Sequence, residues 1–135
     1  MKNLDVILFA GCFAALLWQA PRIITDHLKA PMAGPSLETM IVRESVNQGI
    51  SPAIGIAQAW QESNMQPLAL RLERNGTRSW GLFQVNDVNL RSLRMTNPLD
   101  PQQNIIAGVG LLAYWIDRCG GERAGMLAYR MGHCR

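Results

Sequence analysis

The chain has 135 residues, which is enough for one ordinary domain. Its content of 48% hydrophobic and only 17% charged residues excludes it from the disordered chains. The net charge of +3 is mild, and the arginines are scattered among acids, whereas nucleic-acid binders more often carry a basic stripe. We therefore expect no nucleic-acid partner, although a weakly cationic surface suits an anionic polymer such as a bacterial cell wall.

The N-terminal region contains an uncharged apolar stretch, residues 6–20, "VILFAGCFAALLWQA". This stretch is shorter than the ~20 residues that span a bilayer comfortably. A signal peptide, a retained membrane anchor and a buried helix of an assembly therefore all remain open. Trp18 and Pro21 make a poor cleavage site after Ala20, which favours the anchor. We expect residues 1–24 to be a signal or anchor segment of an exported protein.

A linker is predicted over residues 25–35, because the stretch 21–35 contains three prolines and a glycine. The folded domain is then predicted to span residues 36–135. Its first helix begins after Ser36, whose hydroxyl can cap the helix, and ends at Gly49.

A second helix is predicted over residues 52–63, because Ser51 can cap it and Pro52 suits its first position. This helix is apolar on nearly all sides, which is typical of a central helix. Residues 64–79 are polar and rich in turn formers, and "SWGLFQVN" at 79–86 is either an extended piece or a tight turn. Further helices are predicted at 87–94, 101–117 and 122–131. The predicted fold class is therefore all-α, with one irregular polar excursion and little or no sheet.

Glu62 lies near the C-terminal end of the predicted central helix, where a carboxylate meets the negative end of the helix dipole. Burial beside Trp60 would also disfavour the charged form. Both effects raise the pKa, as a general acid working near neutral pH requires. The alternative is a solvated glutamate at a helix end, and for Glu62 taken alone that alternative is the commoner case.

An ordinary glycosidase uses a second carboxylate, and no downstream acid is a compelling one. Asp87 and Asp100 each most simply cap a following helix. Glu73 lies among arginines, in the polar excursion that is best placed to border a cleft. The remaining candidates flank the C-terminal cysteine region: Asp117 and Glu122.

Cys119 and Cys134 would close a short C-terminal loop, which indicates a disulfide in an oxidising compartment. Two free buried thiols are the alternative. A zinc site is not favoured, because Cys119, His133 and Cys134 offer three ligands, two of them adjacent, where structural zinc usually takes four. We therefore expect no metal and no cofactor.

Four blocks in this order and spacing resemble the catalytic domain of soluble-type lytic transglycosylases. They are "AWQESNMQP" at 59–67, "NGTRSWGLFQVN" at 75–86, "NPLDPQQNIIAGVGLL" at 97–112 and "AYRMG" at 128–132. The resemblance covers about residues 36–132. It implies a single lysozyme-like domain behind the N-terminal hydrophobic helix.

The resemblance also implies residue roles. Glu62 matches the family's catalytic acid. Asp100, Asn104 and Gly108 match a structural block in which they cap a helix, tie down a loop and allow close helix packing. The residues implied to contact the substrate are Ser79, Phe83, Gln84, Asn86 and Tyr129.

The implied activity is cleavage of the bond between N-acetylmuramic acid and N-acetylglucosamine in peptidoglycan. Goose-type lysozymes, which look similar, carry an aspartate where this chain has Asn86, and the missing base favours the transglycosylase route to a 1,6-anhydro product. Arg130 replaces the family's Asn, and longer members carry later tyrosines, so the far side of the cleft is expected to depend on a partner. A muramidase and a non-catalytic peptidoglycan-binding component remain alternatives.

Small members of this family accompany secretion systems, pili and bacteriophages. The implied partners are therefore glycan strands, a membrane bound through residues 6–20, and proteins of a secretion system, pilus or virion. The expected location is the periplasm, free or anchored to the inner membrane, or a virion if a phage encodes the chain.

Overall fold

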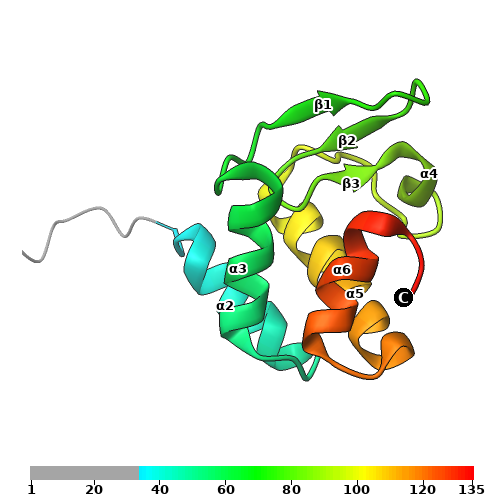
Figure 1. Cartoon of the computed structure of the whole chain (residues 1–135). Helices are drawn as coiled ribbons and strands as arrows, with labels where there is room; N and C mark the ends of the chain where they lie inside the picture. The colour runs from blue at the N-terminus through cyan, green and yellow to red at the C-terminus, as the bar shows by residue number, and fades with distance from the viewer. Residues whose placement is uncertain (1–33) are drawn as a thin grey trace, which may run out of the picture. The chain divides into compact units, whose positions relative to one another are not determined.

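The computed structural model describes residues 34–135 (Figure 1). The predicted anchor segment 1–24, including residues 6–20, and most of the predicted linker 25–35 lie outside the described residues. Within the described part, no helix is long and apolar enough to cross a membrane. Pro35–Arg135 forms one compact unit.

Two helices open this unit, α2 (Leu37–Asn47) and α3 (Pro52–Ser63), close to their predicted bounds. Ser36 caps α2 as predicted, because its hydroxyl accepts a hydrogen bond from the Thr39 amide at 3.2 Å. The two helices pack closely at Gly55, where a Cβ atom would overlap the Ser45 hydroxyl. At its other end α3 stops at Asn64, which has a left-handed backbone with φ of 52°.

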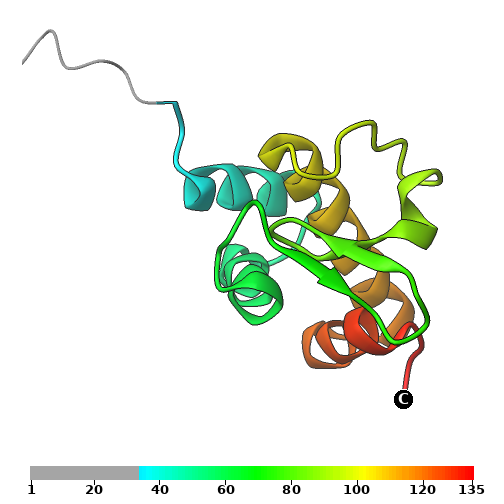
Figure 2. The same cartoon turned by 90° about the horizontal axis from the view of Figure 1, so that it is seen from above.

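The C-terminal half contains α5 (Pro101–Cys119) and α6 (Glu122–Met131), which pack against each other (Figures 1 and 2). Asp100 caps α5 as predicted, since its carboxylate accepts a hydrogen bond from the Gln103 amide at 2.8 Å. Gly125 allows the close contact of the two helices, because a Cβ atom there would lie 2.6 Å from the Ile116 backbone.

A small antiparallel sheet lies at one end of the helices, with β1 (Leu70–Leu72), β2 (Arg78–Trp80) and β3 (Val85–Asn86) in that order (Figure 1). Its register pairs Arg71 with Ser79 and Ser79 with Asn86. Directly opposed residues share one face of a sheet, so these three side chains form a row across it.

The polar excursion and the "SWGLFQVN" stretch thus build the sheet, and the stretch is both extended and turned. Its β2 and β3 strands flank a tight turn over residues 81–84. The short helix α4 (Asp87–Leu90) follows, but Asp87 does not cap it, which corrects the sequence-based expectation. Asn86 is the cap, through a 3.2 Å hydrogen bond from the Val88 amide, because the Asp87 carboxylate turns back to bind the Trp80 indole at 2.6 Å.

The core joins α2, α3, α5 and the β2–β3 turn. Its largest fully buried apolar side chains are Ile41, Leu82, Phe83, Val85, Ile105, Val109 and Leu112. Trp60 is not among them. It is 53% exposed, so the expectation that α3 is buried on nearly all sides is wrong at this residue. The predicted fold class, a mostly helical lysozyme-like domain with little sheet, is confirmed.

Candidate active site

A cleft of about 810 Å³ opens between the sheet, the end of α3 and the C-terminal part of α6. Its walls carry acidic and basic side chains, two glutamates and three arginines. Its lining residues are Glu62, Arg71, Glu73, Arg74, Asn75, Ser79, Gln84, Asn86, Val88, Asn89, Tyr129, Arg130, Met131 and Gly132.

Glu62 enters this cleft from the last turn of α3. One turn earlier on the same helix, the fully buried Gln58 donates a 2.8 Å hydrogen bond from Nε2 to Oε1 of Glu62. Burial raises the pKa of the Glu62 carboxyl above its usual value of 4.5, and the charge of Glu73 adds to the rise. Arg71, Arg130 and the Gln58 hydrogen bond hold the pKa down, but burial has the larger effect. The predicted direction of this pKa shift is therefore confirmed.

The β2–β3 turn is held against the helices by two polar side chains that are themselves mostly or fully buried. Asn104, on α5, accepts from the Phe83 amide at 2.8 Å and donates to the Trp80 and Pro98 carbonyls at 2.8 and 2.9 Å. Ser63, which follows Glu62, donates to the Leu82 carbonyl at 2.7 Å. The end of α3 and the turn are therefore joined next to Glu62.

Gly81 makes the approach of Asn104 possible. Its φ is +70°, and a Cβ atom would lie 2.5 Å from the Asn104 amide nitrogen. Gly108 does the same one turn further along α5, where a Cβ atom would overlap the Phe83 side chain. The predicted role of Asn104 is confirmed, whereas Gly108 allows close packing of α5 on the turn residue Phe83 rather than on another helix.

Tyr129 closes the cleft from α6. Its hydroxyl donates a 2.7 Å hydrogen bond to the Phe83 carbonyl. Burial raises the pKa of this phenol well above its usual value, and the nearby Glu62 charge raises it further. Tyr129 is therefore a neutral hydroxyl beside Glu62.

Glu73 stands on the sheet side of the cleft, just after β1. Its Oε1 accepts two hydrogen bonds, from the Ser79 hydroxyl at 2.6 Å and from Nε of Arg71 at 2.9 Å. Both bonds favour the charged form and lower the pKa of Glu73 below its usual value.

The side-chain amides on the sheet side of the cleft donate their hydrogen bonds to other atoms of the protein. Asn86 donates to the Thr77 and Ser79 hydroxyls at 2.9 and 3.3 Å. Gln84, held at φ of 48°, donates to the Gly81 and Ala69 carbonyls at 2.9 and 3.3 Å. The side-chain amides of Asn86 and Gln84 therefore have no donor left for a bound molecule.

The structure brings together five of the six predicted catalytic and substrate-binding residues: Glu62, Ser79, Gln84, Asn86 and Tyr129 all line the cleft. Phe83 does not. Its side chain is fully buried against Gly108, so the structure corrects its predicted contact with substrate. Only its main-chain carbonyl takes part, by holding Tyr129.

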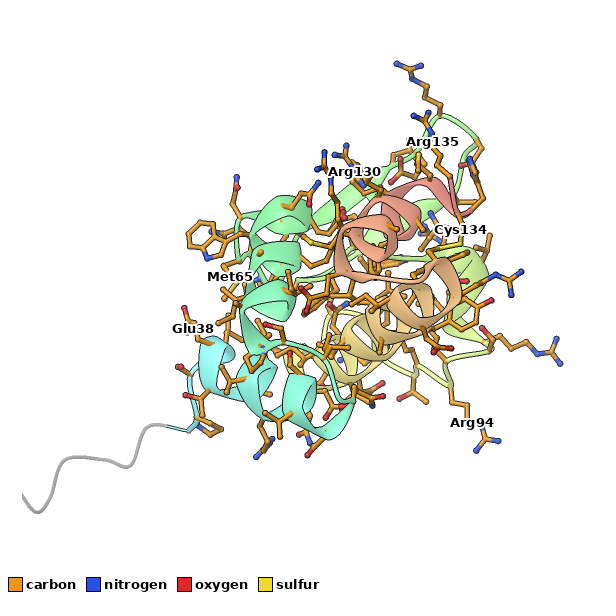
Figure 3. The ribbon with its side chains drawn as sticks, turned by 60° about the horizontal axis from the view of Figure 1, so that its bottom comes forward. Glu38, Met65, Arg94, Arg130, Cys134 and Arg135 are labelled. Atoms are coloured by element: carbon orange, nitrogen blue, oxygen red, sulfur yellow. A yellow bond between two sulfur atoms is a disulfide. The ribbon has the colours of Figure 1, made fainter. Side chains whose placement is uncertain are left out.

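Several site residues were not predicted. Gln58 could have been found, because a residue four positions before Glu62 lies on the same helix face. Glu73 was expected to border a cleft, which is confirmed, but its hydrogen bond with Ser79 depends on the pairing of β1 with β2. Arg130 was noted only as a departure from the family pattern. The structure places it in the last turn of α6 (Figure 3), where it lines the cleft.

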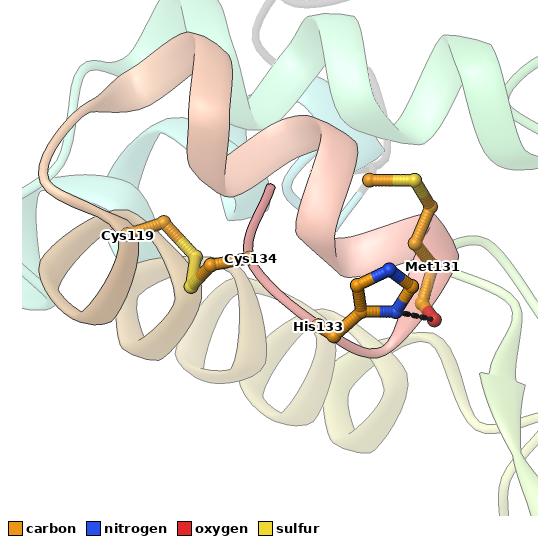
Figure 4. The surroundings of a disulfide bond; sticks show 4 residues. All are labelled: Cys119, Met131, His133 and Cys134. Carbon is orange, nitrogen blue, oxygen red and sulfur yellow. Dashed lines mark hydrogen bonds between the residues drawn. A yellow bond between two sulfur atoms is a disulfide. The ribbon is translucent and has the colours of Figure 1, made fainter.

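The C-terminus is tied to α5 by a disulfide between Cys119 and Cys134, whose Cα atoms are 5.4 Å apart (Figure 4). The predicted pairing is confirmed, and the alternative of two free thiols is excluded. His133 turns away to contact the Met131 carbonyl through Nδ1 at 3.0 Å. Within residues 34–135, no cluster of three or more His, Cys, Asp or Glu side chains could hold a metal ion.

Residues 39–135 match the family described as "Transglycosylase SLT domain". The chain belongs to this family. The match covers every element that lines the cleft, and the resemblance found in the sequence is confirmed.

Two known proteins resemble this member of the SLT family. A transglycosylase of Enterobacteria phage PRD1 is 40% identical over 58 residues, which are 43% of this chain and 22% of that protein. The matched segment is therefore a small part of the phage protein. The solved structure "Bd0314 DslA wild-type form 2" overlaps 89% of this chain and 72% of its own, with a TM-score of 0.42 and 19% identity.

Proposed function

We propose that this chain is a peptidoglycan lytic transglycosylase that cleaves the bond between N-acetylmuramic acid and N-acetylglucosamine. Glu62 is its catalytic acid and base. The observation that carries this proposal is a single carboxyl with a raised pKa on the wall of an open cleft in an SLT-family domain.

The reaction consumes no net proton, because Glu62 gives up one proton and receives another. Protonated Glu62 gives its proton to the bridging oxygen as the bond from that oxygen to C1 of N-acetylmuramic acid breaks. The Glu62 carboxylate then takes the proton of the same sugar's C6 hydroxyl, and O6 bonds to C1. The products are a free 4-hydroxyl on one fragment and a 1,6-anhydro ring on the other, with no water consumed.

The surroundings of Glu62 suit this cycle. Gln58 donates to Oε1, which supports the carboxylate that must exist between the two proton transfers. The side-chain amide of Gln58 is fully buried, and its Oε1 has no partner in the described part of the chain. Rotation of that amide would let it accept from a protonated Glu62, so Gln58 can match both states of the acid.

The test is Glu62→Gln, which keeps the shape of the side chain and removes the transferable proton. Purified sacculi are treated with each protein, and the soluble fragments are analysed by mass spectrometry. Wild type is expected to release anhydro-muropeptides and the variant to release none above background. Release of anhydro fragments by Glu62→Gln would refute the proposed role of Glu62.

A muramidase is the second candidate, because Glu73 is a second carboxylate in the same cleft. Its two accepted hydrogen bonds lower its basicity, which makes it a poor base for activating water. Product masses separate the two reactions, since a hydrolysed fragment carries one more water than an anhydro fragment. Reducing ends as the main product would favour the muramidase.

The proposed setting is the periplasmic side of the bacterial envelope, where the chain opens the wall locally for a secretion system, a pilus or a phage. The Cys119–Cys134 disulfide supports an oxidising compartment. The apolar residues 6–20 support export or anchoring. Intact mass of the mature protein purified from membranes would test both points, because retention of residues 1–24 and of the disulfide each change the mass.

A further inference from the structure

Glu73 is held more firmly than an ordinary surface glutamate. Its Oε1 accepts from Ser79 at 2.6 Å and from Arg71 at 2.9 Å, and the side chain is 30% exposed. The Ser79 side chain behind it is almost fully buried and accepts from Asn86. The sheet therefore fixes the Glu73 carboxylate at the cleft wall in one orientation.

The second oxygen of Glu73 remains available. Within residues 34–135, Oε2 has no hydrogen-bond partner, and the neighbouring Ser79 and Asn86 have spent their donors on the protein itself. A glycan strand presents hydroxyl and amide hydrogens, which need acceptors. Hydrogen bonds to a charged acceptor are about twice as strong as neutral ones, so Oε2 is the strongest free acceptor on this wall.

The pKa values of the two cleft carboxyls, Glu62 and Glu73, are shifted in opposite directions. Burial raises the pKa of Glu62, whereas hydrogen bonds from Ser79 and Arg71 lower the pKa of Glu73. Two carboxyls with separated pKa values can take different roles: Glu62 keeps its proton to higher pH, and Glu73 is charged. The negative charge of Glu73 in turn favours the protonated form of Glu62.

We infer that Glu73 is a further residue of this site: a carboxylate, oriented by Ser79 and Arg71, that accepts a hydrogen bond from the sugar through Oε2 and contributes to the charge around Glu62. This inference rests on the proposed function. It assigns Glu73 no proton transfer of its own.

Other charged groups act on Glu62 as well, and they set the sign of each variant's effect. Arg71 on β1 and Arg130 on α6 oppose Glu73, because each favours the charged form of Glu62. The Tyr129 hydroxyl beside them is neutral. Removing Glu73 and removing Arg71 must therefore shift the pKa of Glu62 in opposite directions.

The experiment measures kcat/KM against pH on soluble uncrosslinked glycan strands. Glu73→Gln keeps the acceptor for Ser79 and Arg71 but removes the charge. We expect kcat/KM to fall about tenfold, the size of one lost hydrogen bond to a charged group. We also expect the alkaline limb, which follows loss of the Glu62 proton, to move to lower pH. Arg71→Gln is expected to move that limb to higher pH.

Two control variants test whether the effect of Glu73→Gln comes from the loss of charge at this position. Glu38→Gln removes one negative charge from α2, which Figure 3 shows well separated from Arg130, and it should leave the rate and the limb unchanged. Glu73→Asp keeps the charge and should restore the position of the limb. Thermal unfolding of each variant shows that the domain is intact.

The inference is overturned if Glu73→Gln keeps the wild-type rate and limb, or if Glu73→Gln and Arg71→Gln move the limb in the same direction. The second result would mean that their ion pair only supports the sheet. Failure of the proposed function looks different, because then Glu62→Gln itself would remain active.

Discussion

The Tyr129 hydroxyl donates a 2.7 Å hydrogen bond to the main-chain carbonyl of Phe83, which joins α6 to the β2–β3 turn across 46 positions of sequence. Phe83 also packs on Gly108 of α5, and its amide is held by Asn104. One turn residue thus receives contacts from two helices. The wall that carries Gln84 is positioned by these contacts.

Tyr129→Phe is expected to lower the free energy of unfolding by about 1 kcal/mol, because the buried Phe83 carbonyl loses its donor. Turnover of glycan strands should fall as well, since the turn beside Glu62 loses its link to α6. Urea unfolding and initial rates check both effects. The matched control is Tyr114→Phe on α5, where the side chain is 49% exposed, and it should change neither. Equal losses in the two variants would contradict the role given to the Tyr129 hydroxyl.

Gly108→Ala is expected to destabilise the domain by about 1–3 kcal/mol, because the new methyl group would overlap the Phe83 side chain in a packed core. Gly110→Ala, two positions along the same helix, meets no atom within 4 Å and should stabilise by up to about 1 kcal/mol through helix propensity. Thermal melts of the two variants should therefore shift in opposite directions. A shift in the same direction would mean that the contact between Gly108 and Phe83 leaves room for a methyl group.

Glu62 also makes the stability depend on pH. Its pKa in the unfolded chain is near 4.5 and is higher in the folded domain. The folded state therefore keeps a proton that the unfolded state releases, and this stabilising contribution, complete below pH 4.5, is lost as pH rises through the folded pKa. Glu62→Gln removes this loss, so the variant should be more stable than wild type above the folded pKa.

The measurement is the difference in unfolding free energy between wild type and Glu62→Gln, taken at several pH values. The difference should grow from pH 4.5 upward and level off above the folded pKa. Glu73 and Asp87 titrate in both proteins, so taking the difference removes most of their contribution. A difference that is constant with pH would show that Glu62 is not desolvated.

Replacing Cys119 and Cys134 by serine is expected to cost about 3 kcal/mol of stability, the loop-closure value for a separation of 15 residues. Activity below the melting temperature should change little, because Tyr129 and Arg130 precede the released segment and α6 still packs on α5. Melting curves with and without reductant, and rates at low temperature, test this. A large loss of activity in a folded variant would assign the C-terminal segment a direct part in the cleft.

Local signals were sufficient for the bounds of α2, α3 and α5, but not for α4, which ends at Leu90 instead of residue 94, nor for the Ser51 side chain, which makes no cap hydrogen bond. The Ser36 and Asp100 caps, the glycine after α5 and the proline at the start of α3 act within a few residues, so the sequence alone predicted their bounds. The three short strands were missed because each pairing is set by its partners and by the turns between them. Trp60 was misplaced for a related reason: apolar character does not say which side of a helix meets the core.

The sequence by itself also determined the family and the candidate acid, because four ordered blocks carry that information within single segments. Only the tertiary structure decided what surrounds Glu62. Burial of its carboxyl and the loss of Phe83 from the cleft lining arise from segments distant in sequence, and the Ser79–Glu73 contact requires the pairing of β1 with β2. Desolvation and charge–charge interaction depend on distance in space, and no local pattern encodes them.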